Sequence, residues 1–198
     1  MNYRPIIIVA GEPNSIFLEI YFKALKKKFK SPLILIASQN LINLQMKKLK
    51  FRKKIRLLNI NNLKKTKLDN KCINLINIDY KSSKAFEKIS SKSNKYLEKS
   101  FEMALKLLKK NFSKKLINGP ISKKYFLKKK YLGITEYLAK KTNKKKFAML
   151  IFNNDLSVSP VTTHLPIKLV SKKITKKNIK KKIILINNFY KKTLGFKP

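Results

Sequence analysis

The chain has 198 residues, 43% of them hydrophobic, which is enough for one good-sized domain or two small ones with a real core. One cysteine excludes an intrachain disulfide, and the apolar run at residues 6–10 is too short for a signal peptide or a membrane span, so we expect a cytoplasmic protein with no membrane association. The formal net charge of +40 would ordinarily favour a nucleic-acid ligand.

The basic residues are nearly all lysine, which argues against a specific nucleic-acid site. Only Arg4, Arg52 and Arg56 are arginine, the residue that suits bidentate contacts to phosphates and base edges. Lysine is spread along the whole chain together with abundant Ile and Asn, as a coding bias would produce, and no zinc-finger, RNA-binding or basic-zipper signature occurs. We therefore interpret the lysines as solvated faces, with a Lys-rich nucleic-acid-binding protein as an alternative. Salt-dependent affinity for polyanions would follow from either.

The first half of the chain alternates apolar runs with segments of helical periodicity. Residues 5–10 are a continuous apolar run ending in Gly-Glu-Pro, which is typical of a buried parallel strand. Ser38 is placed to cap the helix that follows the second such run. The expected elements are strands at 5–10, 32–37, 55–58 and 73–78, and helices at 16–29 and after Ser38.

The second half begins with the strongest helical pattern and continues the alternation. A single apolar stripe over 91–112 predicts a long amphipathic helix. Thr175 is placed to cap the last helix, which carries apolar residues as far as Tyr190, and Gly195 occupies the position of a C-terminal cap. The other expected elements are strands at 115–118, 147–152 and 156–162, and helices at 123–130 and 135–141.

This alternation predicts an α/β fold with a largely parallel sheet. Three of the four glycines, Gly11, Gly119 and Gly133, lie where a strand passes into a helix or turn. Because ligands bind at the carboxyl ends of strands in open α/β sheets, these glycines are expected to mark one rim of a cleft. His164, the only histidine, follows the strand expected at 156–162 and is placed on the same rim.

Four motifs occur in order: "VAGEP" at 9–13, "NGPISK" at 118–123, "GITEYLA" at 133–139 and "VTTHLPIKLV" at 161–170. Together they resemble the 4-hydroxythreonine-4-phosphate dehydrogenase family of pyridoxal phosphate biosynthesis. The Thr-Thr-His-Leu-Pro string is the most specific of them. The similarity runs from about residue 4 to the end of the chain and covers only the first part of the family's sequence.

The resemblance implies a three-layer α/β/α architecture with two lobes, as in the isocitrate and isopropylmalate dehydrogenases, and a homodimer with the active site at its interface. It places a first lobe at 1–134 and the start of a second at 135–198. It also implies NAD and a divalent cation (Zn, Mg or Co) as cofactors. The family oxidises 4-phosphohydroxy-L-threonine to a 3-oxo acid, which loses carbon dioxide to give 3-amino-2-oxopropyl phosphate.

The resemblance also assigns roles to individual residues. His164 matches the first of three histidines that hold the metal, and imidazole is a suitable neutral ligand. Thr135 matches a substrate-binding threonine, and Ile134 stands where the family has a substrate-binding histidine, which an isoleucine cannot replace in hydrogen bonding. Lys123 matches the basic residue that ends the family's Pro-Ile-Asn-Lys stretch, with a charge role at the active-site rim. The NAD-binding residues are not assigned.

Each assignment has a plainer structural alternative. Considered alone, His164 would be a structural hydrogen-bonding residue near a strand end. Thr135 would be a helix N-cap, with Glu136 favoured by the positive end of the helix. Lys123 would be one surface charge among many lysines.

A single histidine cannot form a three-histidine site, and a second copy of the chain would add only a second His164. No G-x-G-x-x-G sequence is present to provide a Rossmann-type nucleotide site. We therefore expect either a fragment of a longer enzyme or a truncated, non-catalytic relative of the same fold.

Overall fold

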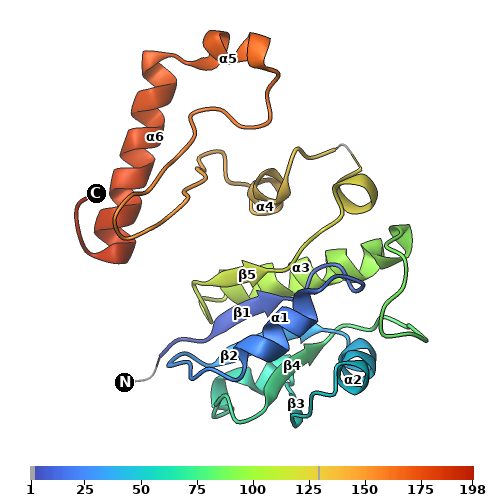
Figure 1. Cartoon of the computed structure of the whole chain (residues 1–198). Helices are drawn as coiled ribbons and strands as arrows, with labels where there is room; N and C mark the ends of the chain where they lie inside the picture. Colours follow the sequence, from blue (N-terminus) through green and yellow to red (C-terminus); the bar gives the residue numbers. More distant parts are fainter. Residues whose placement is uncertain (1–2, 129) are drawn as a thin grey trace. The chain divides into compact units, whose positions relative to one another are not determined.

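The computed structural model describes residues 3–128 and 130–198, and it divides the chain into two compact units, Met1–Lys129 and Lys130–Pro198. The first unit contains a sheet and the helices that cover it, and the second consists of helices and extended segments (Figure 1). The assignment of 1–134 and 135–198 to two lobes of a larger enzyme stays a prediction.

The first unit is built on five strands in the order β3-β4-β2-β1-β5, with every neighbouring pair parallel. The prediction of a parallel sheet is therefore confirmed. Ile8 in the middle of β1 lies opposite Leu35 on one side and Ile117 on the other. The strands are β1 (Ile6–Val9), β2 (Leu33–Ala37), β3 (Ile55–Leu57), β4 (Ile73–Asn77) and β5 (Leu116–Asn118).

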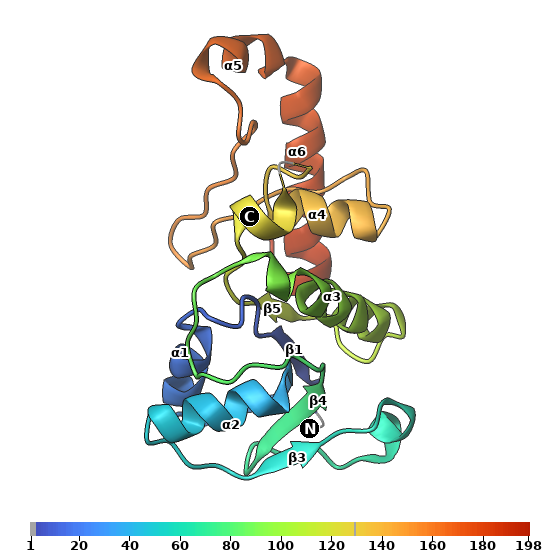
Figure 2. The ribbon, with the colours of Figure 1, turned by 90° about the vertical axis from the view of Figure 1, so that its right-hand side faces the viewer.

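Helices cover both faces of this sheet, which confirms the three-layer arrangement (Figure 2). Helices α1 (Phe17–Ala24) and α2 (Gln39–Lys48) pack on one face, where Ile8 and Leu35 belong to their apolar cluster. Helix α3 (Asn94–Lys109) packs against β1 and β2 on the other face. Alternate residues of each strand point to opposite faces, so strands buried on both sides need continuous apolar sequence.

The capping residues read from the sequence are confirmed at three positions. The Ser38 hydroxyl accepts a hydrogen bond from the backbone N–H of Leu41 at 3.4 Å, and the Thr175 hydroxyl accepts one from Asn178 at 3.2 Å. Gly195 has φ of +85° and ends the last helical segment in the left-handed conformation.

Short helical segments complete the first unit. Residues 91–112, expected to be one helix, form a 3-10 turn followed by α3. The segment expected to be helical at 123–130 is a π-helical turn. These segments are 3-10 helices at Ile60–Lys65 and Ser91–Ser93 and the π-helix at Lys123–Leu127.

The second unit departs from the sequence prediction. The strands expected at 147–152 and 156–162 are wrong, because within the described residues this segment forms only one antiparallel bridge, between Ile151 and Val158. A helix that the sequence did not predict, α5, follows Pro166. The helices of this unit are α4 (Ile134–Lys141), α5 (Ile167–Lys173), α6 (Lys176–Phe189) and a π-helix at Tyr190–Leu194.

Candidate functional site

The loops that follow β1 and β5 meet at the carboxyl end of the sheet. A Cβ atom on Gly11, which has φ of +76°, would lie 2.4 Å from the carbonyl oxygen of Pro120, and one on Gly119 would lie 2.1 Å from that of Ala10. The chain connects β1 to strands on one side and returns to β5 on the other, so this is the switch point where α/β folds bind ligands. Glycine at both positions allows the two backbones to touch.

Glu12, in the first of these loops, is a buried carboxylate that is 3% exposed. Its Oε2 accepts a hydrogen bond from the Ser93 hydroxyl at 3.1 Å, whereas no partner for Oε1 exists among the described residues. Burial raises the pKa of Glu12, and the Ser93 hydrogen bond opposes that effect in part. Its backbone N–H donates to Pro120 at 2.7 Å, so Glu12 ties the β1 loop to the β5 loop and to the start of α3.

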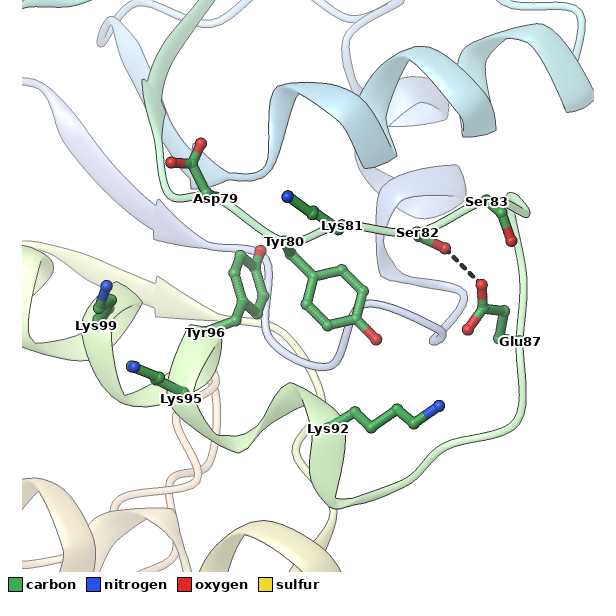
Figure 3. A pocket seen from close by; sticks show the side chains of 10 residues that line it. All are labelled: Asp79, Tyr80, Lys81, Ser82, Ser83, Glu87, Lys92, Lys95, Tyr96 and Lys99. Carbon is green, nitrogen blue, oxygen red and sulfur yellow. Dashed lines mark hydrogen bonds between the residues drawn. The ribbon is translucent and has the colours of Figure 1, made fainter.

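A pocket of about 670 Å³ lies between the segment that follows β4 and the first turns of α3 (Figure 3). Lys95 and Lys99 of α3 line this pocket together with Lys92 of the preceding 3-10 turn, and Tyr80 and Lys81 come from the facing segment. Lys95 and Lys99 are four residues apart, which places them on one stripe of the helix.

The charge of this pocket does not distinguish it from the rest of the surface. Its ten lining residues include four lysines and two acidic residues, an excess of positive charge in the same proportion as +40 over 198 residues. Both acids are engaged: Glu87 accepts from the Ser82 hydroxyl at 2.8 Å and Asp79 from the Asn77 amide at 2.7 Å. The Ser82 hydrogen bond is the main cause that lowers the pKa of Glu87. We assign no ligand to this pocket.

Lys123 is exposed at the first position of the π-helical turn in the first unit. The Ser122 hydroxyl caps that turn by accepting from the backbone N–H of Tyr125 at 3.2 Å. Because Lys123 is exposed, its ammonium group is accessible to a ligand from solvent. The catalytic role of Lys123 stays a prediction.

The start of α4 holds the two predicted substrate-binding residues. Ile134 and Thr135 are the first two helical residues, both half-buried, and the N-cap is Gly133. The alternative role of Thr135 as the helix N-cap is therefore wrong, because Thr135 already lies inside the first turn. Glu136 also lies in this turn, where a carboxylate interacts favourably with the helix dipole, as the sequence predicted.

His164 is exposed and has a left-handed backbone conformation, with φ of +56°. Among the described residues, four other non-glycine positions with positive φ all end helices, where this conformation is common: Lys50, Asn111, Lys128 and Asn143. His164 is different because it lies in a loop that follows no helix. An unfavourable backbone conformation outside a cap points to a functional constraint on this residue.

Gly133, Glu136 and His164 meet in the second unit. A Cβ atom on Gly133 would lie 3.0 Å from Oε2 of Glu136 and 3.2 Å from Nε2 of His164. Oε1 of Glu136 accepts from the Thr163 hydroxyl at 3.5 Å, but Oε2 is buried and has no hydrogen-bond partner among the described residues. Sequence reasoning missed Glu136 as a neighbour of His164, because 27 residues separate Thr163 from Glu136 and no local pattern joins them.

The residues beside Gly133 include two atom types that divalent cations use as ligands. An imidazole nitrogen and a carboxylate oxygen both approach Gly133. No group of three or more His, Cys, Asp or Glu side chains suited to a metal occurs in the part of the chain that the structure describes. The two pairs of the predicted rim, Gly11 with Gly119 and Gly133 with His164, belong to different compact units, and a single shared rim stays a prediction.

Residues 28–198 match the model of the pyridoxal phosphate biosynthetic protein PdxA family. The chain belongs to this family. All four predicted site residues of this PdxA-family chain lie within the matched range. Within the described residues, no helix is both long enough and apolar enough to cross a membrane.

Curated and solved PdxA relatives carry the same name. The chain is 40% identical over 82 residues to the 4-hydroxythreonine-4-phosphate dehydrogenase of Sulfurihydrogenibium sp. and 42% identical over 93 residues to that of Hydrogenobaculum sp.; these matches cover 40% and 43% of this chain and 26% and 29% of those proteins. Structures so named, from Klebsiella pneumoniae and, as putative, from Salmonella typhimurium, match with TM-scores of 0.84 and 0.83 at 18% and 20% identity. They cover 98% and 95% of this chain, which spans 61% and 59% of theirs, and they confirm the α/β fold.

Proposed function

We propose that this PdxA-family chain contributes a metal and substrate site to the NAD-dependent and divalent-metal-dependent oxidation of 4-phosphohydroxy-L-threonine. The observation that carries the proposal is the position of His164, which is exposed, held in an unfavourable backbone conformation and close to Gly133, which an unpartnered carboxylate oxygen also approaches.

The proposed reaction removes a hydride from the carbon that bears the substrate's secondary hydroxyl, and NAD accepts it. The hydroxyl proton leaves to a base or to solvent, and the resulting 3-oxo acid then releases carbon dioxide to give 3-amino-2-oxopropyl phosphate. A divalent cation at His164 would withdraw electron density from the hydroxyl oxygen and later from the ketone oxygen.

The other site residues act on the substrate. The Thr135 hydroxyl, at the start of α4, would hydrogen-bond a polar group of the substrate. Ile134 offers only apolar surface, so it would exclude water without orienting the substrate. The exposed ammonium group of Lys123 would attract the phosphate or carboxylate of the substrate, or hold a proton near the reacting hydroxyl.

The proposal includes a homodimer as the working form and a cytoplasmic location, with no specific nucleic-acid ligand. The second candidate function is a non-catalytic relative of the same fold. The donor groups favour this alternative, because the described residues bring one imidazole and one carboxylate together at Gly133 and no third ligand.

The test is an assay of the 198-residue chain with NAD, 4-phosphohydroxy-L-threonine and Zn²⁺, Mg²⁺ or Co²⁺, in which NADH is followed by its absorbance. Substrate-dependent NADH formation that His164→Ala abolishes would support the proposal. Lys123→Ala should lower the rate, with Lys124→Ala, its exposed neighbour, as the matched control. Ile134→His should lower KM by about three- to tenfold, the value of one restored hydrogen bond. Absence of NADH with all three cations would overturn catalysis by this chain on its own.

A further inference from the structure

We propose that residues 79–90, called the strap below, open and close as a unit at the carboxyl end of the sheet, and that the side chain of Gln45 is the latch that holds them closed. The strap connects β4 to the 3-10 turn before α3. The structure describes all of its residues, and they form neither helix nor strand. Long loops of this kind are commonly active-site lids or binding loops. The inference concerns the first unit only and is independent of the proposed reaction.

The strap packs loosely between two fixed ends. Ile78 before it and Ser93 after it are buried, whereas none of the residues from 79 to 90 is buried. The apolar side chains of Phe86 and Ile89 in the strap are each 38% exposed. A segment that covers little apolar surface opens at a low free-energy cost, because little hydrophobic stabilisation is lost. The strap can therefore open while the sheet stays folded.

Hydrogen bonds from side chains hold the strap to the loop after β1 and to α2. Nε2 of Gln45, a fully buried residue of α2, donates to the carbonyl oxygen of Ala85 at 2.9 Å and to that of Pro13 at 3.0 Å. Gln45 thus joins the strap to the β1 loop. Asn14 of the same loop adds a second bond, because its Oδ1 accepts from the backbone N–H of Glu87 at 3.1 Å. At the start of the strap, the Ser38 hydroxyl donates to the Tyr80 carbonyl oxygen at 3.1 Å, and the Ser82 N–H donates to Asn40 at 3.4 Å.

Gln45 lies on a face of α2 where an apolar residue would be expected. It is one turn after Leu41, which belongs to the apolar cluster under the sheet. Its Oε1 is buried and has no hydrogen-bond partner among the described residues. A buried amide oxygen without a partner is unfavourable, and the two bonds donated by Nε2 offset that cost. The bond to the strap is therefore a main contribution of this amide to the closed conformation.

Opening of the strap would join two pockets into one cleft. The pocket of about 670 Å³ in Figure 3 is lined from the side of α3, and a second pocket of about 450 Å³ is lined from the side of α2. Both pockets share the first four residues of the strap, which form the wall between them: Asp79, Tyr80, Lys81 and Ser82. The joined cleft would lie at the carboxyl end of the sheet, where open α/β folds bind ligands.

Hydrogen exchange of single backbone amides, followed by NMR, tests the strap in the unaltered chain. The Ser82 and Glu87 amides are both bonded to side chains outside the strap, so they exchange only when it opens. After correction for intrinsic rates, both should exchange at least about 100-fold faster than the amides of β2, and at equal opening free energies. Low concentrations of urea should hardly change their rates, because strap opening exposes little surface. Exchange with the rates and urea dependence of β2 would overturn the proposal.

Gln45→Met tests the latch, since methionine keeps the volume and removes the donor. It should raise the exchange rates of the Ser82 and Glu87 amides together by about five- to tenfold, the value of one hydrogen bond, although Gln45 contacts neither amide. Asn14→Ala should raise the rate of the Ser82 amide by a similar factor. Gln39→Met is the matched control, because it is the same change on the same helix at a residue that bonds through its backbone N–H.

The control should leave both strap amides within about twofold of their original rates. Unchanged rates in Gln45→Met would overturn the role of Gln45 as the latch. A response of one strap amide without the other would overturn opening as a unit. Circular dichroism checks that each variant is folded, and the measurement on the unaltered chain tests the strap even if a variant does not fold.

Discussion

Gly11 and Gly119 are in contact through their backbones, since a Cβ atom on Gly11 would lie 2.7 Å from the carbonyl carbon of Gly119. The contact joins the loops that follow the two neighbouring strands β1 and β5. It fixes the distance between the buried Glu12 loop and the segment that leads to Lys123. Any side chain at either position must push these loops apart, and this property can be tested directly.

Gly11→Ala should destabilise the chain through both backbone conformation and close contact. The positive φ of Gly11 costs an alanine about 1 kcal/mol, and the clash with Pro120 adds about 1–3 kcal/mol. Gly195→Ala is the matched control, because Gly195 also has positive φ but no atom lies within 4 Å of its added Cβ. Urea unfolding measures both. Equal losses of stability in the two variants would contradict the close contact.

Glu12→Gln should make the chain less sensitive to pH. Because the pKa of Glu12 is raised in the folded state, folding is favoured when this group is protonated. That contribution is complete below the ordinary value of 4.5 and is lost as the pH rises through the folded pKa. The glutamine variant should therefore gain stability relative to the unaltered chain at neutral pH, and the difference should shrink toward pH 4.5.

Urea unfolding of both proteins across this pH range provides the measurement. Glu19→Gln is the control, because Glu19 lies on the surface of α1 and pairs with Lys23 at 2.6 Å. That change should cost no more than about 0.5 kcal/mol. A stability difference for Glu12→Gln that does not vary with pH would argue against the effect of burial.

His164→Gly should be more stable than His164→Ala by about 1 kcal/mol, although both variants lose the imidazole. Glycine adopts the left-handed conformation of this position freely, whereas alanine does not. Thermal unfolding under identical conditions compares the two. If alanine is tolerated as well as glycine, the backbone at residue 164 is not constrained as described.

Binding to polyanions should depend on the total number of lysines and not on one patch. The salt dependence is the slope of the logarithm of the binding constant for single-stranded DNA against the logarithm of the salt concentration. Changing Lys92, Lys95 and Lys99 to Gln should reduce the magnitude of this slope by about 2 at most. Changing the exposed Lys176, Lys177 and Lys180 should have the same effect. Loss of binding in the first variant alone would identify a localised anion site, contrary to this expectation.

The sheet could be predicted from sequence because its strands are buried on both faces. A continuous apolar run such as Leu33–Ala37, which is buried at every position, predicts a strand that is covered on both faces. The same reasoning failed for 147–152 and 156–162, where apolar residues such as Met149 and Leu156 are 46% and 73% exposed. A strand needs a partner as well as a pattern, and the sequence does not reveal whether a partner is present.

The candidate site was predictable only where a motif marked it. His164 and Thr135 lie in motifs that can be found in the sequence, whereas the approach of His164 and Glu136 to Gly133 arises only when two distant segments fold together. The left-handed backbone of His164 is also invisible in sequence, since no glycine or asparagine marks it. The sequence alone thus predicts a role for His164 but does not reveal which residues lie near it.

No side chain of α6 is buried, and this affects how easily the helix opens in the native state. A helix that covers little can open without exposing much new surface, while opening β2 would expose five fully covered residues at once. Backbone amides of α6 should therefore take up deuterium long before those of the central strands. The second unit, which carries His164, would then open more often than the sheet of the first unit, so the two compact units would differ in local stability as well as in architecture.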